Sequence, residues 1–180
     1  MAILDILLNL TRLRDRDTLE VALAAALYGL VRPRRLRAWR VIAHAGDKYL
    51  VQSLLFDEDT LLHVPQIQLD MDQLLPLDNW PPLWRLVCES GMSQSTQDVD
   101  NLLLLPVYLN QTTVELLELE GCVIDTPQDL PVLDRLLQMY TNHLQILDYA
   151  EKDTLTGLLN RKTFETHFNK LLALESISDE

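Results

Sequence analysis

Glycine and cysteine are both scarce in this chain of 180 residues. There are five glycines, and Gly157 is the only one after Gly121. The sequence contains no glycine-rich phosphate loop, and no Ser-His-Asp or paired-carboxylate arrangement stands out. Cys88 and Cys122 are isolated and lack the Cys-x-x-Cys spacing of metal or redox sites, which favours two buried, reduced thiols. The histidines also stand alone, so we expect no metal or haem ligand set. They are His44, His63, His143 and His167.

Long hydrophobic runs are missing as well, although apolar residues make up 48% of the chain. No run approaches the roughly 20 residues that are needed to cross a bilayer. Residues 2–10 are apolar, but this stretch is short, contains Asp5 and lacks the small-residue cleavage pattern of a signal peptide. We therefore expect one cytoplasmic domain with appendages and no membrane span.

Basic residues are outnumbered by acidic ones, 15 to 27, and the net charge is −12. The distribution is uneven, because residues 1–40 carry +4 and the remainder carries −16. A nucleic-acid surface is basic, so the total charge argues against nucleic acid as a partner. The arginines of the first 40 residues more simply pair with acidic surface elsewhere in the domain or in a second copy.

A long amphipathic helix is predicted over 127–152. Thr126 is a suitable N-cap, and Pro127 fits the first helical position, where its missing N–H costs nothing. Apolar side chains then recur at alternating spacings of three and four residues. They are Leu130, Leu133, Leu137, Tyr140, Leu144 and Leu147. Flanking positions widen the apolar arc, so the helix can pack on its own domain and on a second copy of the chain, and we expect a homodimer through it.

The segment 153–164, directly after this helix, carries the most specific pattern in the chain. It resembles the opening of the diguanylate cyclase (GGDEF) catalytic domain, whose signature reads D-x-L-T-G-L-x-N-R-R-x-F, with Lys162 in place of the second arginine. The matching residues are Asp153, Leu155, Thr156, Gly157, Leu158, Asn160, Arg161 and Phe164. In that family this turn sets the angle at which the signalling helix meets the cyclase. In local terms, Gly157 would end one helix and Asn160 would cap another.

The rest of such a cyclase is not found in these 180 residues. The Gly-Gly-Asp/Glu-Glu-Phe loop, the carboxylates that hold metal ions and the residues that hold GTP would all follow Glu180. We therefore expect a longer parent protein. The resemblance implies that this chain has no catalytic residues and makes no cyclic di-GMP, and that GTP and Mg²⁺ belong to the missing catalytic domain. A final helix from Arg161 would then expose Phe164 and Phe168.

Ahead of the long helix, the periodicity of apolar residues changes several times between that of helices and that of strands. The expected elements are helices over 3–13 and 17–31, strands over 36–45 and 49–56, a helix over 82–90, and a hairpin of strands over 102–109 and 113–124. Asp17 and Glu20 resemble the two ends of a capping box at the start of the second helix.

This order of elements is similar to that of a GAF domain, an α+β fold with an antiparallel sheet, helices packed on one face and a small-molecule pocket on the other. The run 105–108 followed by 114–119 resembles the last two strands of that family, although Thr112, Thr113 and Glu115 stand where glycines are common. A PAS-type sensor is the main rival. The expected domains are a GAF-like sensor domain over 1–126, a signalling and dimerisation helix over 127–152, and the stub of a GGDEF domain over 153–180.

If the pocket of that family is present, we expect it to be lined by aromatic, histidine and cysteine side chains. The candidates are Trp39, His44, Tyr49, Trp84, Tyr108 and Cys122. Ordinary core packing would account for each of them as well. Neither the Cys-His pair of bilin-binding GAF domains nor the Asn-Lys-Phe-Asp-Glu pattern of cyclic-nucleotide GAF domains is found, so the small-molecule effector stays unidentified.

Two classes of function follow from the sequence. The first is a regulatory sensor and dimerisation module of a diguanylate cyclase, which would control the synthesis of cyclic di-GMP from GTP. The alternative is a non-enzymatic module that binds a partner protein or a small ligand through a GAF or PAS domain.

Overall fold

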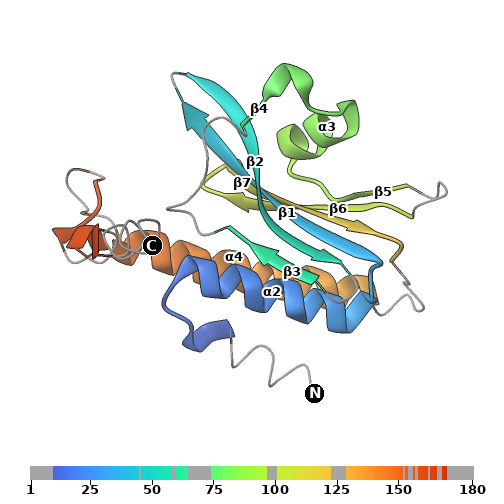
Figure 1. Cartoon of the computed structure of the whole chain (residues 1–180), viewed down its shortest axis with the longest axis horizontal. Helices are drawn as coiled ribbons and strands as arrows, with labels where there is room; N and C mark the ends of the chain where they lie inside the picture. Colours follow the sequence, from blue (N-terminus) through green and yellow to red (C-terminus); the bar gives the residue numbers. More distant parts are fainter. Residues whose placement is uncertain are drawn as a thin grey trace, which may run out of the picture.

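A computed structural model of the chain shows an antiparallel sheet of seven strands with helices on both faces (Figure 1). The expected α+β class is therefore confirmed. The residues that the structure describes are 10–44, 46–57, 60–64, 74–96, 101–122, 129–151, 153, 156, 158–161, 163–165 and 168–169. Most of the helix expected over 3–13 lies outside them. None of the described helices is long and apolar enough to cross a membrane.

The sheet is built from two long hairpins that pair with each other side by side. Its strands are β1 (Arg35–His44), β2 (Asp47–Asp57), β3 (Thr60–His63), β4 (Leu75–Pro76), β5 (Gln94–Ser95), β6 (Leu103–Leu109) and β7 (Thr112–Glu120). They are ordered β3-β2-β1-β7-β6-β5, and β4 pairs with β2. The pairing of β1 with β7 joins the first hairpin to the last one, so the centre of the sheet comes from the two ends of the domain. The strands predicted over 36–45, 49–56, 102–109 and 113–124 correspond to β1, β2, β6 and β7, whereas the short β3, β4 and β5 were not predicted.

The last hairpin turns through Asn110 and Gln111 alone. Their φ angles are 49° and 65°, in the left-handed region. Two consecutive residues with positive φ are typical of the type I′ turn, whose twist matches that of the flanking strands. Thr112, which we expected in the turn, is the first residue of β7. Asparagine tolerates this conformation well, so the hairpin closes without glycine.

Two helices cover one face of the sheet (Figure 1). They are α2 (Arg16–Val31) and α4 (Asp129–Glu151), and they also contact each other. Leu23 of α2, Leu117 of β7 and Tyr140 of α4 are at most 1% exposed and belong to the same apolar cluster. The long helix is therefore part of the core of the domain.

The N-cap of α2 lies two residues before the predicted one, Asp17. Asp15 is the N-cap, because its carboxylate accepts a hydrogen bond from the backbone N–H of Thr18 at 3.0 Å. Asp17 and Glu20, which we expected to form the capping box, lie inside the helix. Their carboxylates have other partners, described below.

A smaller layer covers part of the opposite face. It consists of η3 (Leu77–Asn79) and α3 (Pro82–Ser90), which begins at a proline and ends at Gly91 as predicted. Trp84 of α3 packs on Leu104 and Leu116 of the sheet. Since neighbouring strand residues point to opposite faces, Leu116 and Leu117 supply the two different cores.

Candidate functional site

The aromatic residues predicted for a pocket are only partly brought together. Trp39 of β1 and Trp84 of α3 lie on the same face of the sheet, with ring centroids 5.0 Å apart. Tyr108 is 42% exposed, and its hydroxyl donates to the carbonyl oxygen of Gln111 at 2.7 Å. Tyr49 is half-buried and is paired in β2 with Pro76. Trp39 and Trp84 are thus the two candidates that meet.

The remaining pocket candidates do not support a pocket on the α3 side. Cys122 belongs to the apolar core under α2 and α4, on the other side of the sheet. The side chain of His44 lies outside the described residues. Burial raises the pKa of the Cys88 and Cys122 thiols to about 11 each, so both are protonated at neutral pH. Of the two thiols expected to be buried, Cys122 is buried and Cys88 is only partly buried.

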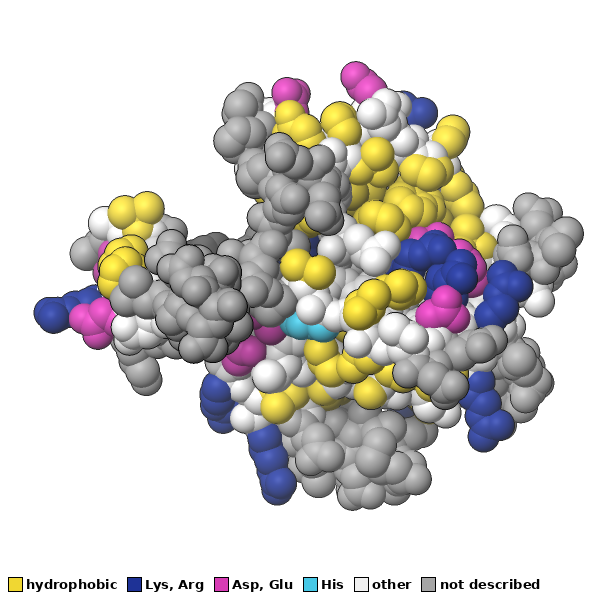
Figure 2. Space-filling view, viewed as in Figure 1, with side chains coloured by type: hydrophobic (Ala, Val, Ile, Leu, Met, Phe, Trp, Pro, Cys, Tyr) yellow, Lys and Arg dark blue, Asp and Glu magenta, His cyan; other side chains and the backbone are white. Residues whose placement is uncertain are grey.

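A ladder of opposite charges lies next to Trp39 on the same face. The indole N–H of Trp39 donates to Glu118 at 2.9 Å, and Arg37 lies 3.0 Å from Glu118 and 2.8 Å from Glu120. Arg35 pairs with Glu120 and, at 2.8 Å, with Asp57. Such mixed charge is visible in Figure 2, where basic and acidic side chains lie side by side near the apolar area around α3. Arg35 and Arg37 therefore pair with carboxylates of their own domain, one of the two arrangements expected for the early arginines.

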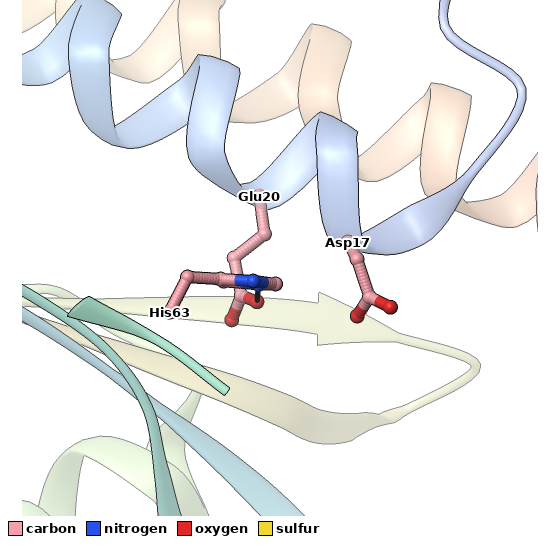
Figure 3. A group of neighbouring side chains, drawn as sticks. All are labelled: Asp17, Glu20 and His63. Atoms are coloured by element: carbon pink, nitrogen blue, oxygen red, sulfur yellow. Dashed lines mark hydrogen bonds and ion pairs between the residues drawn. The ribbon is translucent and has the colours of Figure 1, made fainter. Parts of the chain in front are cut away.

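A second charged cluster is buried between α2 and the sheet, and Figure 3 shows three of its members. Glu20 of α2 is 1% exposed and Arg40 of β1 is 3% exposed. Arg40 donates from Nη2 to Glu20 and, at 2.9 Å, to Asp17. Ser53 of β2 also donates to Glu20, and His63 Nε2 of β3 lies 3.0 Å from Glu20 Oε2. Glu20 thereby ties α2 to three neighbouring strands.

The charges of this cluster stabilise one another. Burial alone would raise the pKa of Glu20, but hydrogen bonds with His63 and Ser53 and the charge of Arg40 hold it below its usual value. Burial alone would lower the pKa of Arg40, but the charge of Glu20 and the hydrogen bond to Asp17 outweigh the effect of burial. The pKa of Arg40 is therefore raised, and the guanidinium stays charged. Glu20 and Arg40 therefore form an ion pair at neutral pH.

Asp17, Glu20 and His63 also have the chemistry of a metal site. One ligand atom from each lies within 4.8 Å of the others. However, the guanidinium of Arg40 already pairs with both carboxylates. A metal ion would have to displace a buried positive charge, and we therefore interpret Arg40 as the resident cation of this cluster.

One further carboxylate connects the sheet to α4. Glu115 of β7 lies directly opposite Arg40 in the sheet and is fully buried. Tyr140 of α4, also fully buried, donates from its hydroxyl to Glu115 Oε2 at 2.9 Å. Burial, followed by the nearby charge of Glu20, raises the pKa of Glu115 to about 7. A carboxyl group that is half protonated near neutral pH thus lies under the long helix.

Comparisons with known proteins were made by sequence and by structure. No family model and no curated protein matches the sequence. Among solved structures, residues 122 to 287 of a methyl-accepting chemotaxis protein are similar, with a TM-score of 0.61 at 9% identity over 81% of this chain and 98% of that chain. The GAF domain of the cyanobacteriochrome TePixJ has a TM-score of 0.57 at 16% identity, over 78% of this chain and 95% of the other. A GAF domain of an Acinetobacter phosphoenolpyruvate-protein phosphotransferase also reaches 0.57, at 9% identity over 84% of this chain and 95% of that one.

The chain has a GAF-like fold. The expectation that rested on the order of elements is confirmed for the fold. Identities of 9–16% say nothing about a ligand or an activity.

The apolar stripe of α4 packs inside this GAF-like domain. Five of its six predicted residues are at most 8% exposed and belong to the core under the helix layer. They are Leu133, Leu137, Tyr140, Leu144 and Leu147, and the side chain of Leu130 lies outside the described residues. The stripe is therefore unavailable as a seam between two copies while the helix stays packed. Ile146 and Tyr149, at 61% and 72% exposed, lie on the outer side.

The turn after α4 is closed by the side chains that match the cyclase pattern. Asp153 accepts hydrogen bonds from the backbone N–H and the hydroxyl of Thr156, both at 2.9 Å. Asn160 donates from Nδ2 to the carbonyl oxygen of Ala150 at 2.6 Å and accepts from the backbone N–H of Thr163 at 3.0 Å. Asn160 thus binds the end of α4 and caps the following turn, as its position predicted.

The other motif residues are mostly exposed. Leu158 is 70% exposed and Phe164 is 58% exposed, and Phe164 stacks on Phe168 with ring centroids 6.1 Å apart. Arg161 pairs with Glu165 at 2.8 Å. The expectation that Phe164 and Phe168 would be uncovered is confirmed, whereas Leu155 and Gly157 lie outside the described residues.

Removing one member of the buried ion pair tests the charged cluster. Glu20→Gln leaves Arg40 with Asp17 as its remaining carboxylate, and we expect a loss of about 3–5 kcal/mol in the free energy of unfolding at pH 7. Because the pKa of Glu20 is lowered on folding, its stabilisation is lost as the pH falls through the folded-state pKa, and this acid sensitivity should shrink in the variant.

Urea denaturation at several pH values measures both effects. Glu165→Gln is the matched control, because it breaks the exposed pair with Arg161 and should leave the urea midpoint unchanged. Equal midpoints for the two variants would contradict the role given to Glu20.

Proposed function

We propose that this chain is the regulatory input module of a diguanylate cyclase and that α4 transmits its state to a catalytic domain that begins at the turn after the helix. One observation carries the proposal: a single helix runs from the core of the GAF-like domain to the cyclase-like turn. Tyr140 is anchored on the sheet, and the carbonyl oxygens of Ala150 and Glu151 accept hydrogen bonds from Asn160.

The proposed mechanism uses the hydrogen bonds that join α4 to the turn. A cyclase of this family joins two GTP molecules held by two catalytic domains, so the relative placement of those domains controls its rate. A shift or rotation of α4 against the sheet would be passed to the turn, because the side chain of Asn160 is bonded to the last turn of the helix. An input that changes the packing under α4 would thereby change the population of the productive arrangement.

The test is made on the gene and on the full-length protein. We expect the reading frame to continue beyond residue 180 into a Gly-Gly-Asp/Glu-Glu-Phe motif, and the full-length protein to convert GTP to cyclic di-GMP in the presence of Mg²⁺. Chromatographic analysis of the product measures this activity, and the 180-residue chain serves as the inactive control. A different domain after α4, or a full-length protein that leaves GTP unchanged, would contradict the cyclase assignment.

The proposed control needs a dimer, and we place its contact on the outer side of α4. Ile146 is exposed, and Val132 and Met139 are half-buried. Their spacing of seven residues puts the three side chains on one face of the helix, beside the buried stripe. A contact through this face would leave the helix packed on its own domain.

Replacing Ile146 tests this contact. We expect Ile146→Glu to weaken self-association at least tenfold, because the contact would have to bury a charge. Gln145→Glu adds the same charge one residue earlier, about 100° around the helix, and should leave self-association unchanged. Sedimentation equilibrium measures the mass of each protein. A wild-type protein that is monomeric at every concentration, at full length as well, would contradict the dimer.

A further inference from the structure

The buried cluster around Glu115 contains more charges than a structural ion pair requires. Its titratable and charged members come from two helices and three strands. They are Arg16, Asp17 and Glu20 on α2, Arg40 on β1, His63 on β3, Glu115 on β7, and Tyr140 and His143 on α4. His143 is engaged elsewhere, because its Nε2 lies 2.7 Å from the carbonyl oxygen of Leu13.

The hydrogen bonds of the cluster leave specific atoms unpaired. Within the described part of the chain, Glu115 Oε1 has no hydrogen-bond partner, and neither do Nε and Nη1 of Arg40. Both residues are at most 3% exposed, and they face each other across β1 and β7. Arg40 directs Nη2 to Asp17 and Glu20, although its charge still acts on Glu115.

The arginine that faces Glu115 is already matched by other carboxylates. Arg40 is hydrogen-bonded to Asp17 and Glu20, and Glu115 has no arginine hydrogen-bonded to it within the described part of the chain. Ionised Glu115 would add a third negative charge to a dry interior. This agrees with the raised pKa of Glu115. Burial and then the charge of Glu20 raise this pKa, and they outweigh the two arginines and the hydrogen bond from Tyr140, which lower it.

We propose that Glu115 and Tyr140 form a proton-operated latch that holds α4 on the sheet when Glu115 is protonated and releases it more readily when Glu115 is ionised. The latch deepens the proposed function, because it names protons as an input to the helix that leads to the output, and its effect on the cyclase rests on that function. The latch itself is a property of the GAF-like domain alone.

The direction of the response follows from linkage. Opening α4 lets water reach Glu115, whose pKa then returns from about 7 towards 4.5. The closed state therefore binds one more proton than the open state between these two values, and its advantage is full below 4.5 and lost as the pH rises through 7. Mild acid tightens the latch, and neutral or alkaline pH loosens it.

Hydrogen exchange of the α4 amides, corrected for the intrinsic exchange rate at each pH, measures this opening. Between pH 5.5 and 7.5 we expect the opening constant of the wild-type protein to rise roughly twentyfold. Glu115→Gln is the decisive variant, because its amide keeps an oxygen that accepts from Tyr140 but does not ionise. Its opening constant should change less than about twofold over the same range.

Two further variants separate the latch from other titrations. Tyr140→Phe removes the hydrogen bond and keeps the carboxyl group, so α4 should open more often at every pH and retain the pH dependence. His63→Gln removes the other group that can take up a proton near Glu20 and should also retain it. The proposal would be overturned if the opening constant of the wild type did not depend on pH. It would also be overturned if Glu115→Gln showed the same pH dependence as the wild type, or if His63→Gln abolished that dependence. None of these results depends on whether the full-length protein makes cyclic di-GMP, so the latch and the cyclase assignment fail independently.

Discussion

The positive charge of Arg40, buried on the helix-facing side of β1, is the constraint on which the helix layer depends. A guanidinium in this position requires carboxylates at hydrogen-bonding distance, because an unpaired buried charge costs several kcal/mol. Asp17 and Glu20 supply them from one turn of α2. These ion pairs restrict the position of α2 along the sheet more than the packing of its leucines does. Apolar contacts tolerate small shifts of a helix, whereas hydrogen-bonded ion pairs do not. Ser53 and His63 then bond to Glu20 and extend the same constraint to β2 and β3.

The position of α2 determines the surroundings of α4. Glu115 faces Arg40 across the sheet, but Arg40 is committed to α2, so Glu115 is left with Tyr140 as its hydrogen-bond donor. The inner side of α4 is thereby used within the domain, by Tyr140 and by leucines on both sides of it. Its outer side, with Ile146, and the turn at Asn160 are what the helix can offer to a second copy or a following domain. Packing and signalling thus use different sides of one helix.

The sequence predicted those parts of the structure that depend on periodicity and on local rules. The apolar stripe of α4, the strands of both hairpins and the ends of α3 follow from spacing, proline and glycine. The role of Asn160 as a cap was predicted because the cap is formed by residues close in sequence. The function of the stripe was predicted less well, since periodicity shows that a face is buried but not whether its own domain or a second copy covers it.

The buried cluster could not be predicted from the sequence for a physical reason. Charged residues are usually exposed, so the sequence alone predicts that Glu20, Arg40 and Glu115 lie on the surface. Only the fold shows that they lie close together in the interior. Glu20 also fitted a capping pattern that Asp15 in fact satisfies. The one available signal is the placement of Arg40 and Glu115 at positions where an alternating strand should be apolar. It becomes meaningful only when the pairing of β1 with β7 is known.

A double-mutant cycle between Tyr140 and Glu115 tests most directly whether α4 is tied to the sheet through this pair. The free energy of unfolding would be measured in urea at pH 6 for the wild type, Tyr140→Phe, Glu115→Leu and the double variant, in which leucine removes the acceptor. We expect the two losses to overlap by about 1 kcal/mol, the usual contribution of a buried hydrogen bond. Losses that add without any overlap would show that the contact does not hold the helix, and would contradict this account.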